Sequence, residues 1–181
     1  DQTELAALIG EGELRTLVDV AALTAIETDL QQLAVRFHAR SVDGIHDLLL
    51  RLGDLSAAEI DSRALPGVTA AALDTLVAAR RAVAIRLGGE TRLIAVEDVA
   101  RYRDGLGTPL PPGLPAALLE PAPDALGDLV RRYARTHGPF TAGEAAVRFG
   151  LGVAVVEATL QRLAATGRVV AGEFRPGGHG R

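Results

Sequence analysis

The stretch Thr69-Ala-Ala-Ala-Leu-Asp-Thr-Leu-Val-Ala-Ala-Arg80 decides the fold of this chain, together with the residues on either side of it. Its leucines recur at helical spacing, and the apolar residues of Ala82–Leu87 then alternate as they do in a β-strand. A second strand is predicted over Arg92–Val96, which would close a β-hairpin. Two shorter helices, Asp43–Leu52 and Ser56–Arg63, are predicted before this stretch. Three helices followed by a hairpin, the wing, form the winged-helix arrangement, a relative of the helix-turn-helix.

The same order of elements is predicted a second time, about 85 residues further along the chain. The second set comprises helices over Ala125–His137, Thr141–Phe149 and Val153–Thr166, and a strand over Arg168–Phe174. Three features recur in the same order, namely a capping box, an apolar pair in the third helix and the start of a strand: Ser56-Ala-Ala-Glu59 and Thr141-Ala-Gly-Glu144, Leu73/Leu76 and Leu160/Leu163, Arg81-Ala-Val83 and Arg168-Val-Val170. The predicted fold is therefore mainly α with small β-hairpins (α+β): tandem winged-helix domains preceded by a short helical segment. Leu76 and Leu163 are expected to be buried at equivalent positions of two independently folded units.

Four segments follow from these patterns. They are an N-terminal helical segment (1–40), the first winged helix (41–104), a Pro-rich linker (105–123) and the second winged helix (124–181), whose wing is expected to be truncated. Apolar residues of the first segment recur every three or four positions and are expected to pack on the first winged helix: Leu23, Ile26, Leu30, Leu33 and Phe37. Six of the nine prolines lie in 105–123, which predicts an extended, stiff linker that separates the winged helices.

The composition removes several classes of enzyme. Because the chain has no Lys and no Cys, it has no Walker A lysine, Schiff base, thiol nucleophile or Cys-based zinc site. The four histidines (His38, His46, His137 and His179) are scattered outside any metal-binding frame. We therefore expect no catalytic, cofactor-binding or metal-binding residues in this segment. The missing initiating Met suggests a segment excised from a longer chain.

Charge and hydropathy limit the cellular location and the classes of partner that we expect. Residues 1–31 carry a net charge of −6, residues 32–123 a charge of −1 and residues 124–181 a charge of +3. Only the last segment resembles the basic footprint of a nucleic-acid-binding module. No apolar run reaches the ~18–20 residues of a membrane span and no signal peptide is visible, so we expect a soluble, cytoplasmic segment with no membrane partner.

Candidate nucleic-acid-binding residues of the first unit lie at the end of its third helix and in its wing. They are Arg80, Arg81, Arg86 and Arg92, which are suited to phosphate contact. The alternative is that they are solvated arginines paired with Glu90 or Asp98. Once Leu73, Leu76 and Val77 are buried, the third helix shows mainly Ala, Thr and Asp, which favours a structural or protein-facing role over base recognition.

The second unit offers more polar side chains. Its candidate nucleic-acid-binding residues are Thr159, Gln161 and Arg162 on the third helix and Arg168, Arg175, His179 and Arg181 in the wing. The alternative reading of the wing is a frayed, basic chain end.

Longer runs of sequence carry a family resemblance. The runs Gly127-Asp-Leu-Val-Arg-Arg-Tyr-Ala-Arg-Thr-His-Gly-Pro-Phe-Thr141, Ala146-Val-Arg-Phe-Gly-Leu-Gly-Val153 and Gly172-Glu-Phe-Arg-Pro-Gly-Gly178 resemble the C-terminal region of bacterial large helicase-related proteins. The run Ala95-Val-Glu-Asp-Val-Ala-Arg-Tyr-Arg-Asp-Gly-Leu-Gly107 is similar too. The likeness covers roughly residues 40–181.

The resemblance implies a parent that is a superfamily 2 ATP-dependent DNA helicase, translocating 3′ to 5′ and linked to DNA repair. ATP and Mg²⁺ would be bound in the parent's ATPase core, outside this segment. The implied partners are DNA, single-stranded or duplex, and further copies of the chain in a homo-oligomer. The rival readings are a purely structural assembly module with no DNA contact, a stand-alone transcriptional regulator and a glycosylase-like catalytic module.

Overall fold

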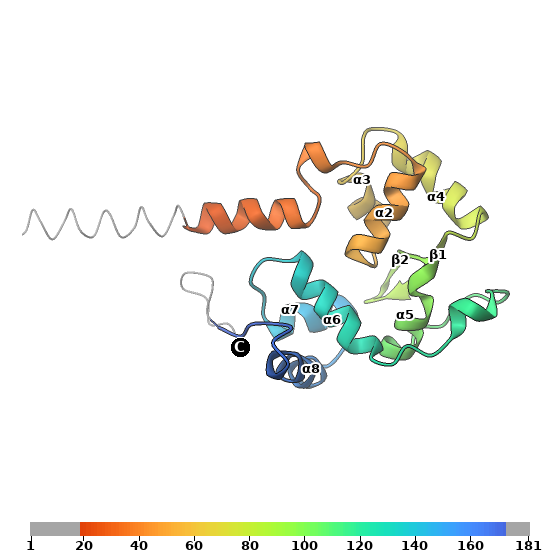
Figure 1. The fold of residues 1–181 in the computed structure, drawn as a ribbon. Coiled ribbons are helices and arrows are strands. Elements are labelled where there is room, and N and C mark those ends of the chain that lie inside the picture. The colour runs from red at the N-terminus through yellow and green to blue at the C-terminus, as the bar shows by residue number, and fades with distance from the viewer. Residues whose placement is uncertain (1–18, 173–181) are drawn as a thin grey trace, which may run out of the picture.

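The computed structural model describes residues 19–172 (Figure 1). The first described element is a helix over residues 19–30. The elements that follow are, in chain order, η1 (Val35–Phe37), α2 (Val42–Leu52), α3 (Ala57–Asp61), α4 (Val68–Ala78), β1 (Ala82–Leu87), β2 (Glu90–Ala95), η2 (Val96–Asp98), α5 (Val99–Leu106), η3 (Ala116–Leu119), α6 (Ala125–Thr136), α7 (Ala142–Phe149) and α8 (Val153–Ala165).

Helices α2, α3 and α4 confirm the first predicted three-helix unit, because local signals fix where these helices begin. The Ser41 hydroxyl accepts a hydrogen bond from the Gly44 N–H at 3.1 Å and caps α2. At the start of α3, Ser56 and Glu59 form the reciprocal capping box that the sequence predicts. The boundaries agree with the predicted ones to within a few residues.

The predicted hairpin is also confirmed. β1 and β2 pair antiparallel, from Ala82 opposite Ala95 to Leu87 opposite Glu90. Gly88 and Gly89 form the turn with φ angles of 61° and 82°, a left-handed conformation that glycine adopts at little cost. The two-residue turn therefore fixes the register of the hairpin.

The hairpin separates two hydrophobic cores. Its Ala82, Leu93 and Ala95 belong to the core built on α2, α3 and α4. Residues of its other face, Val83, Ile85, Leu87 and Ile94, pack with α5, α6, α7 and α8. Since side chains alternate across a strand, one hairpin serves both helical groups; in Figure 1 it lies between them.

Helices α6, α7 and α8 repeat the order of the first unit, and the Thr141–Glu144 capping box forms as predicted. Leu76 and Leu163 are both buried, at 0% and 1% exposure. However, residues 168–172 form no strand, and the rest of the predicted strand lies outside the described residues. Within the described chain there is one hairpin, so two units that each have their own wing are not shown. Leu163 packs in a core to which the first hairpin contributes.

The Pro-rich segment 105–123 is more than a spacer between helical groups. Its leucines pack against the core shared by the hairpin and the second three-helix unit: Leu106, Leu110, Leu114, Leu118 and Leu119. The prolines keep the backbone extended between these contacts, as expected. The segment therefore covers the core instead of holding the two groups apart.

The predicted packing of the N-terminal helix on the first winged helix is wrong for much of its apolar stripe. Ile26 is 54% exposed, Leu33 38% and Phe37 40%, while Leu23 and Leu30 are half-buried. No described helix has the length and apolar character needed to cross a bilayer.

Candidate nucleic-acid interface

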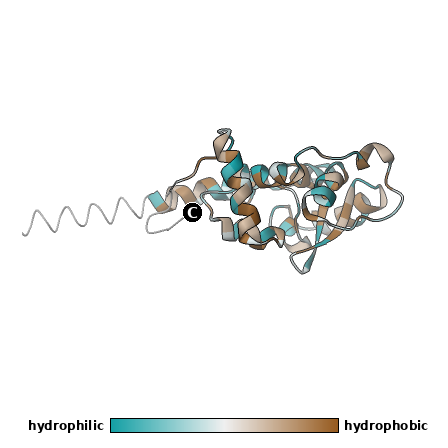
Figure 2. Ribbon diagram, turned by 90° about the horizontal axis from the view of Figure 1, so that it is seen from below, coloured by the Kyte–Doolittle hydropathy of each residue, from teal (hydrophilic) through white to brown (hydrophobic). Residues whose placement is uncertain are grey.

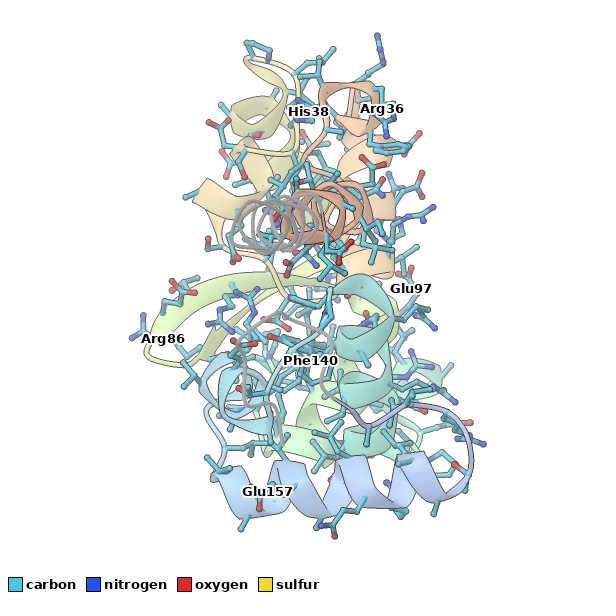
Figure 3. The ribbon with its side chains drawn as sticks, turned by 90° about the vertical axis from the view of Figure 1, so that its left-hand side faces the viewer. Arg36, His38, Arg86, Glu97, Phe140 and Glu157 are labelled. Carbon is cyan, nitrogen blue, oxygen red and sulfur yellow. The ribbon has the colours of Figure 1, made fainter. Side chains whose placement is uncertain are left out.

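The arginines predicted to form one phosphate-binding cluster on the first unit are divided between surface and interior. Arg86 is exposed near the hairpin turn and donates to the Gly89 carbonyl at 2.9 Å. Figure 3 shows Arg86 at the outer end of the hairpin, pointing away from the body of the molecule. Arg80 is exposed just after α4 and donates to the Gly113 carbonyl at 2.7 Å. Neither guanidinium has a carboxylate partner among the described residues, so both keep a free positive charge.

The other two arginines of this set are paired with acids. Arg81 forms an ion pair with Asp43 at 2.7 Å. Arg92 is 5% exposed and contacts Asp54 at 2.9 Å and Glu90 at 2.7 Å. The prediction of Arg92 as a phosphate contact is wrong, because its strand position turns it towards the face that packs on the second unit.

Arg92 belongs to a charged network that joins the two units. Its centre is Asp54, which is 4% exposed and accepts the Tyr102 hydroxyl proton at 2.7 Å. Arg148 of α7 reaches the same carboxylate at 3.2 Å and also pairs with Glu59 at 2.8 Å. Because α7 belongs to the second unit and Glu59 to the first, Arg148 ties the two units together.

Burial and pairing shift the pKa values of this network. Burial, reinforced by the Asp54 charge, raises the pKa of Tyr102 well above its ordinary value. Burial alone would raise the pKa of Glu59, but the Arg148 guanidinium and the Ser56 N–H outweigh it and hold this pKa below its usual range. Tyr102 is therefore a neutral donor and Glu59 a charged acceptor.

A second branch of the network connects α5 with α6. Arg132 is 8% exposed, donates to Asp98 at 2.8 Å and reaches the Tyr102 hydroxyl at 3.3 Å. Asp98 also accepts from Arg101 at 2.9 Å. The sequence did not single out Asp54, Tyr102, Arg132 or Arg148 as a group, since these residues lie far apart in the chain.

A small cavity of about 80 Å³ lies beside this network, between the two units. Gln31, Glu59, Tyr133 and His137 are among the residues that line it. Among the described residues, the one buried side-chain polar atom without a hydrogen-bond partner is the Thr69 hydroxyl, which is not part of this lining. No group of acidic, His or Cys side chains in the described chain has the arrangement of a metal site. The network thus joins the two units and presents no orphaned group to a ligand.

The candidates on α8 also differ in their accessibility. Thr159 is 7% exposed and its hydroxyl donates to the Val155 carbonyl at 2.9 Å, so the prediction that it faces outward is wrong. Gln161 is exposed. Arg162 is exposed but makes a two-pronged ion pair with Asp124, at 2.8 and 2.9 Å, which lowers the pKa of Asp124. Its positive charge is therefore largely neutralised.

Beyond α8, Arg168 is exposed and has no described carboxylate within ion-pair distance. Arg175, His179 and Arg181 lie outside the described residues. Three further exposed arginines also lack a described acidic partner and were not singled out from the sequence: Arg40, Arg51 and Arg135. Arg51 and Arg135 lie in the last turns of α2 and α6, a position that favours cations and could have drawn attention to them.

The outward faces of the third helices carry few groups that read bases. On α4 the Thr75 hydroxyl donates to the Ala71 carbonyl at 2.8 Å, and Val77, which was expected to be buried, is 44% exposed. On α8 the exposed residues include Val153 (45%) and Val155 (48%), and Figure 3 shows Glu157 on the outer side of this helix. Phosphate contact by arginines is therefore better supported than base recognition.

Comparisons with known proteins agree with this architecture. Residues 16–121 match the family model of the large helicase-related protein, winged-helix domain. The chain is 47% identical over 174 residues to the Lhr helicase/probable uracil glycosylase of Mycolicibacterium smegmatis, covering 96% of this chain and 12% of that protein. It is 35% identical over 172 residues to the Lhr helicase/uracil glycosylase of Escherichia coli, covering 94% of this chain and 11% of that protein. The chain thus spans about an eighth or less of these relatives, and it belongs to the large helicase-related protein family.

Proposed function

We propose that this chain is a nucleic-acid-contacting part of a longer ATP-dependent DNA helicase of the large helicase-related family. In this proposal α2–α4 with the hairpin and α6–α8 act as tandem winged-helix units that share one wing. The parent protein would translocate 3′ to 5′ in DNA repair, and its ATP and Mg²⁺ would be bound outside residues 1–181. The chain's own contribution is to hold single-stranded or duplex DNA by its phosphates.

The observation that carries this proposal is the free charge of Arg86 at the tip of the wing. The wing of a winged helix contacts the nucleic-acid backbone, and an exposed guanidinium without an acidic partner suits a phosphate. Arg168, after α8, supplies a second exposed guanidinium; it forms no described ion pair, although its charge helps to lower the pKa of the Asp124 carboxyl that Arg162 binds. Arg92, Arg81 and Arg162 are already occupied by carboxylates and are not part of the proposed contact.

A salt titration tests this contact. We expect Arg86→Ala combined with Arg168→Ala to weaken binding to a fluorescent 3′-tailed duplex. Loss of two phosphate contacts reduces the magnitude of the slope of log K against log salt by about 1.8. The ratio of the affinity of the unmodified chain to that of the double variant therefore falls about tenfold between 50 and 200 mM salt. The control is Arg36→Ala with Arg103→Ala, which removes the same charge from arginines already paired with Asp29 and Asp104. Equal slopes for both double variants would reject the contact.

A second candidate function, protein–protein assembly without DNA contact, is favoured by a different observation. Val147 on α7 is 79% exposed, close in sequence to the exposed Val153 and Val155 of α8. Exposed large apolar side chains mark a protein interface where they form one patch. Light scattering over a range of concentrations tests it: this reading predicts a multimer that Val147→Asp dissociates, and a chain that stays monomeric throughout contradicts it.

A further inference from the structure

The guanidinium that carries the proposed phosphate contact is fixed to the turn of the hairpin. Arg86 donates to the Gly89 carbonyl at 2.9 Å and to the Thr91 hydroxyl at 3.3 Å. Gly89 lies in the turn itself, and Thr91 is the residue opposite Arg86 on the other strand. The direction in which Arg86 points is therefore set by the position of the turn (Figure 3).

This turn lies against the end of α7 in the second unit. A Cβ added at Gly150, the residue after α7, would lie 3.6 Å from the Gly88 backbone nitrogen, so the two backbones approach closely. Leu87, just before the turn, is 7% exposed and belongs to the same core as Phe149, the last residue of α7. Figure 2 shows hydrophobic stretches along the helices of the body on which the hairpin packs. The outer end of the wing is thus buried against the second unit.

Arg148 of α7 connects this junction to the first unit. Its carbonyl accepts a hydrogen bond from the Arg92 guanidinium at 2.7 Å, which fastens β2 to the end of α7. Its side chain pairs with Asp54 at 3.2 Å and donates twice to the Glu59 carboxylate, at 2.8 and 3.1 Å. One residue therefore holds the strand by its main chain and the first unit by its side chain.

The wing needs such support because two strands alone hold a position poorly. An isolated two-stranded hairpin is marginally stable in water. The wing contacts the core of α2–α4 through Ala82, Leu93 and Ala95, which lie away from the turn. A guanidinium binds a phosphate oxygen at about 2.7–2.9 Å between heavy atoms. A wing tip that moves freely would leave this distance for part of the time and bind phosphate more weakly.

We propose that Arg148 is a positioning residue for the phosphate contact of the wing. Through Arg92 and the turn it holds Arg86 in place, so the second unit contributes to a contact that the hairpin makes. Arg148 does not itself bind the phosphate, since its side chain is 23% exposed and is paired with two acids. The inference rests on the proposed phosphate contact of Arg86 and adds the group that fixes its geometry.

A double-mutant cycle in DNA binding tests the positioning. The full-length protein is titrated with salt in the presence of the fluorescent 3′-tailed duplex. We expect Arg148→Ala to lower the magnitude of the slope of log K against log salt by about 0.9, the share of one phosphate contact, as Arg86→Ala does. The double variant should have the same slope as Arg86→Ala alone, because the contact is already lost. If Arg148→Ala leaves the slope unchanged while Arg86→Ala lowers it, the inference is overturned and the phosphate contact stands.

Arg132→Ala is the matched control. Arg132 is a buried arginine of the same network, but its described hydrogen bonds go to Asp98, Tyr102 and the Leu50 carbonyl, and none to the hairpin. We expect it to keep the slope of the unmodified protein. An equal fall of the slope in Arg132→Ala and Arg148→Ala would assign the effect to general destabilisation and reject the positioning role. A slope that Arg86→Ala itself leaves unchanged would reject the phosphate contact, and this inference with it.

Hydrogen–deuterium exchange follows the wing in the absence of DNA. We expect the amides of Leu87 and Glu90, which flank the turn, to exchange about tenfold faster in Arg148→Ala than in Arg132→Ala, with those of α4 unchanged. Equal exchange in the two variants would overturn the proposal.

A milder variant covers the case in which Arg148→Ala does not fold. Glu59→Gln removes one acidic partner of Arg148 but keeps the capping box of α3, which glutamine also forms. It should change the salt slope and the exchange of the wing in the same directions by smaller amounts. A folded Glu59→Gln protein that changes neither would reject the positioning role.

Discussion

Replacing Asp54 with Asn tests whether the charged network joins the two units. The carboxylate of Asp54 is 4% exposed, accepts from Arg92 at 2.9 Å and from Tyr102 at 2.7 Å, and forms an ion pair with Arg148 at 3.2 Å. Asparagine keeps the shape of the side chain but removes the charge, and it can turn only one oxygen towards these donors. Arg92 would then be a buried cation that has lost its most buried counter-charge.

The expected cost follows from the contacts that remain. Removing one partner of a buried ion pair costs about 3–5 kcal/mol. Arg92 keeps Glu90 at 2.7 Å and the Arg148 carbonyl at 2.7 Å, so we expect the lower end of that range, about 3 kcal/mol. For a chain of this size, such a loss lowers the unfolding midpoint by about 6–12 °C.

The measurement is equilibrium unfolding in urea and by heat, followed by circular dichroism. The control is Asp43→Asn, the same chemical change at a pair of similar length: Arg81 and Asp43 are 2.7 Å apart, with side chains 39% and 79% exposed. Because the pair is exposed, it contributes at most about 1 kcal/mol to the free energy of unfolding. This figure includes the favourable interaction of the Asp43 charge with the N-terminus of α2. If the two variants lose stability to within about 0.5 kcal/mol of each other, a thermodynamic role for the buried network is refuted.

Two further predictions concern a glycine and a histidine at the junction. Urea unfolding should show that Gly53→Ala destabilises the chain by about 2–3 kcal/mol more than Gly67→Ala does. Both glycines have φ angles near +82°, so the backbone strain is the same in the two variants. Only a Cβ at Gly53 meets another group, the Tyr102 hydroxyl, at 2.7 Å. Equal losses would show that the junction yields to accommodate the methyl group. Burial, assisted by the nearby Arg148 and Arg63 guanidiniums, lowers the pKa of His137 in the folded chain. The unfolded chain therefore binds this proton more readily, so stability is fully present above about pH 6.5 and is lost as the pH falls through the histidine range. We expect the loss of unfolding free energy between pH 7.5 and pH 5.0, measured in urea, to be smaller in His137→Gln than in the unmodified chain; equal losses in the two would contradict this origin.

Local chemistry explains why the elements of the first unit were predictable. The capping boxes at Ser56 and Thr141 each satisfy backbone donors within four residues of sequence, so their effect does not depend on the rest of the molecule. The Gly88-Gly89 turn is equally local, because its left-handed angles are those that glycine tolerates. Helices α2, α4 and α8 and the hairpin consequently lie close to their predicted ranges.

The candidate interface was predictable only in part, because a sequence shows which residues are cationic and not which are already paired. Arg86 and Arg92 lie six residues apart, yet one is exposed and the other is paired with a buried aspartate 38 residues away. Arg148 gave no signal, since its partners Asp54 and Glu59 belong to the other helical unit. Thr159 was assigned to the outer face of its helix, and packing turned it inward.

The sequence by itself determined the order of the helices, their caps and the hairpin turn, because each depends on residues that are neighbours along the chain. Only the tertiary structure decided that one hairpin serves both units and that the Pro-rich leucines complete the shared core. It also decided which arginines keep a free charge and that the first described helix leaves Val20 and Ile26 exposed. These outcomes depend on burial and on ion pairs between distant residues, which are fixed when whole faces of the structure meet.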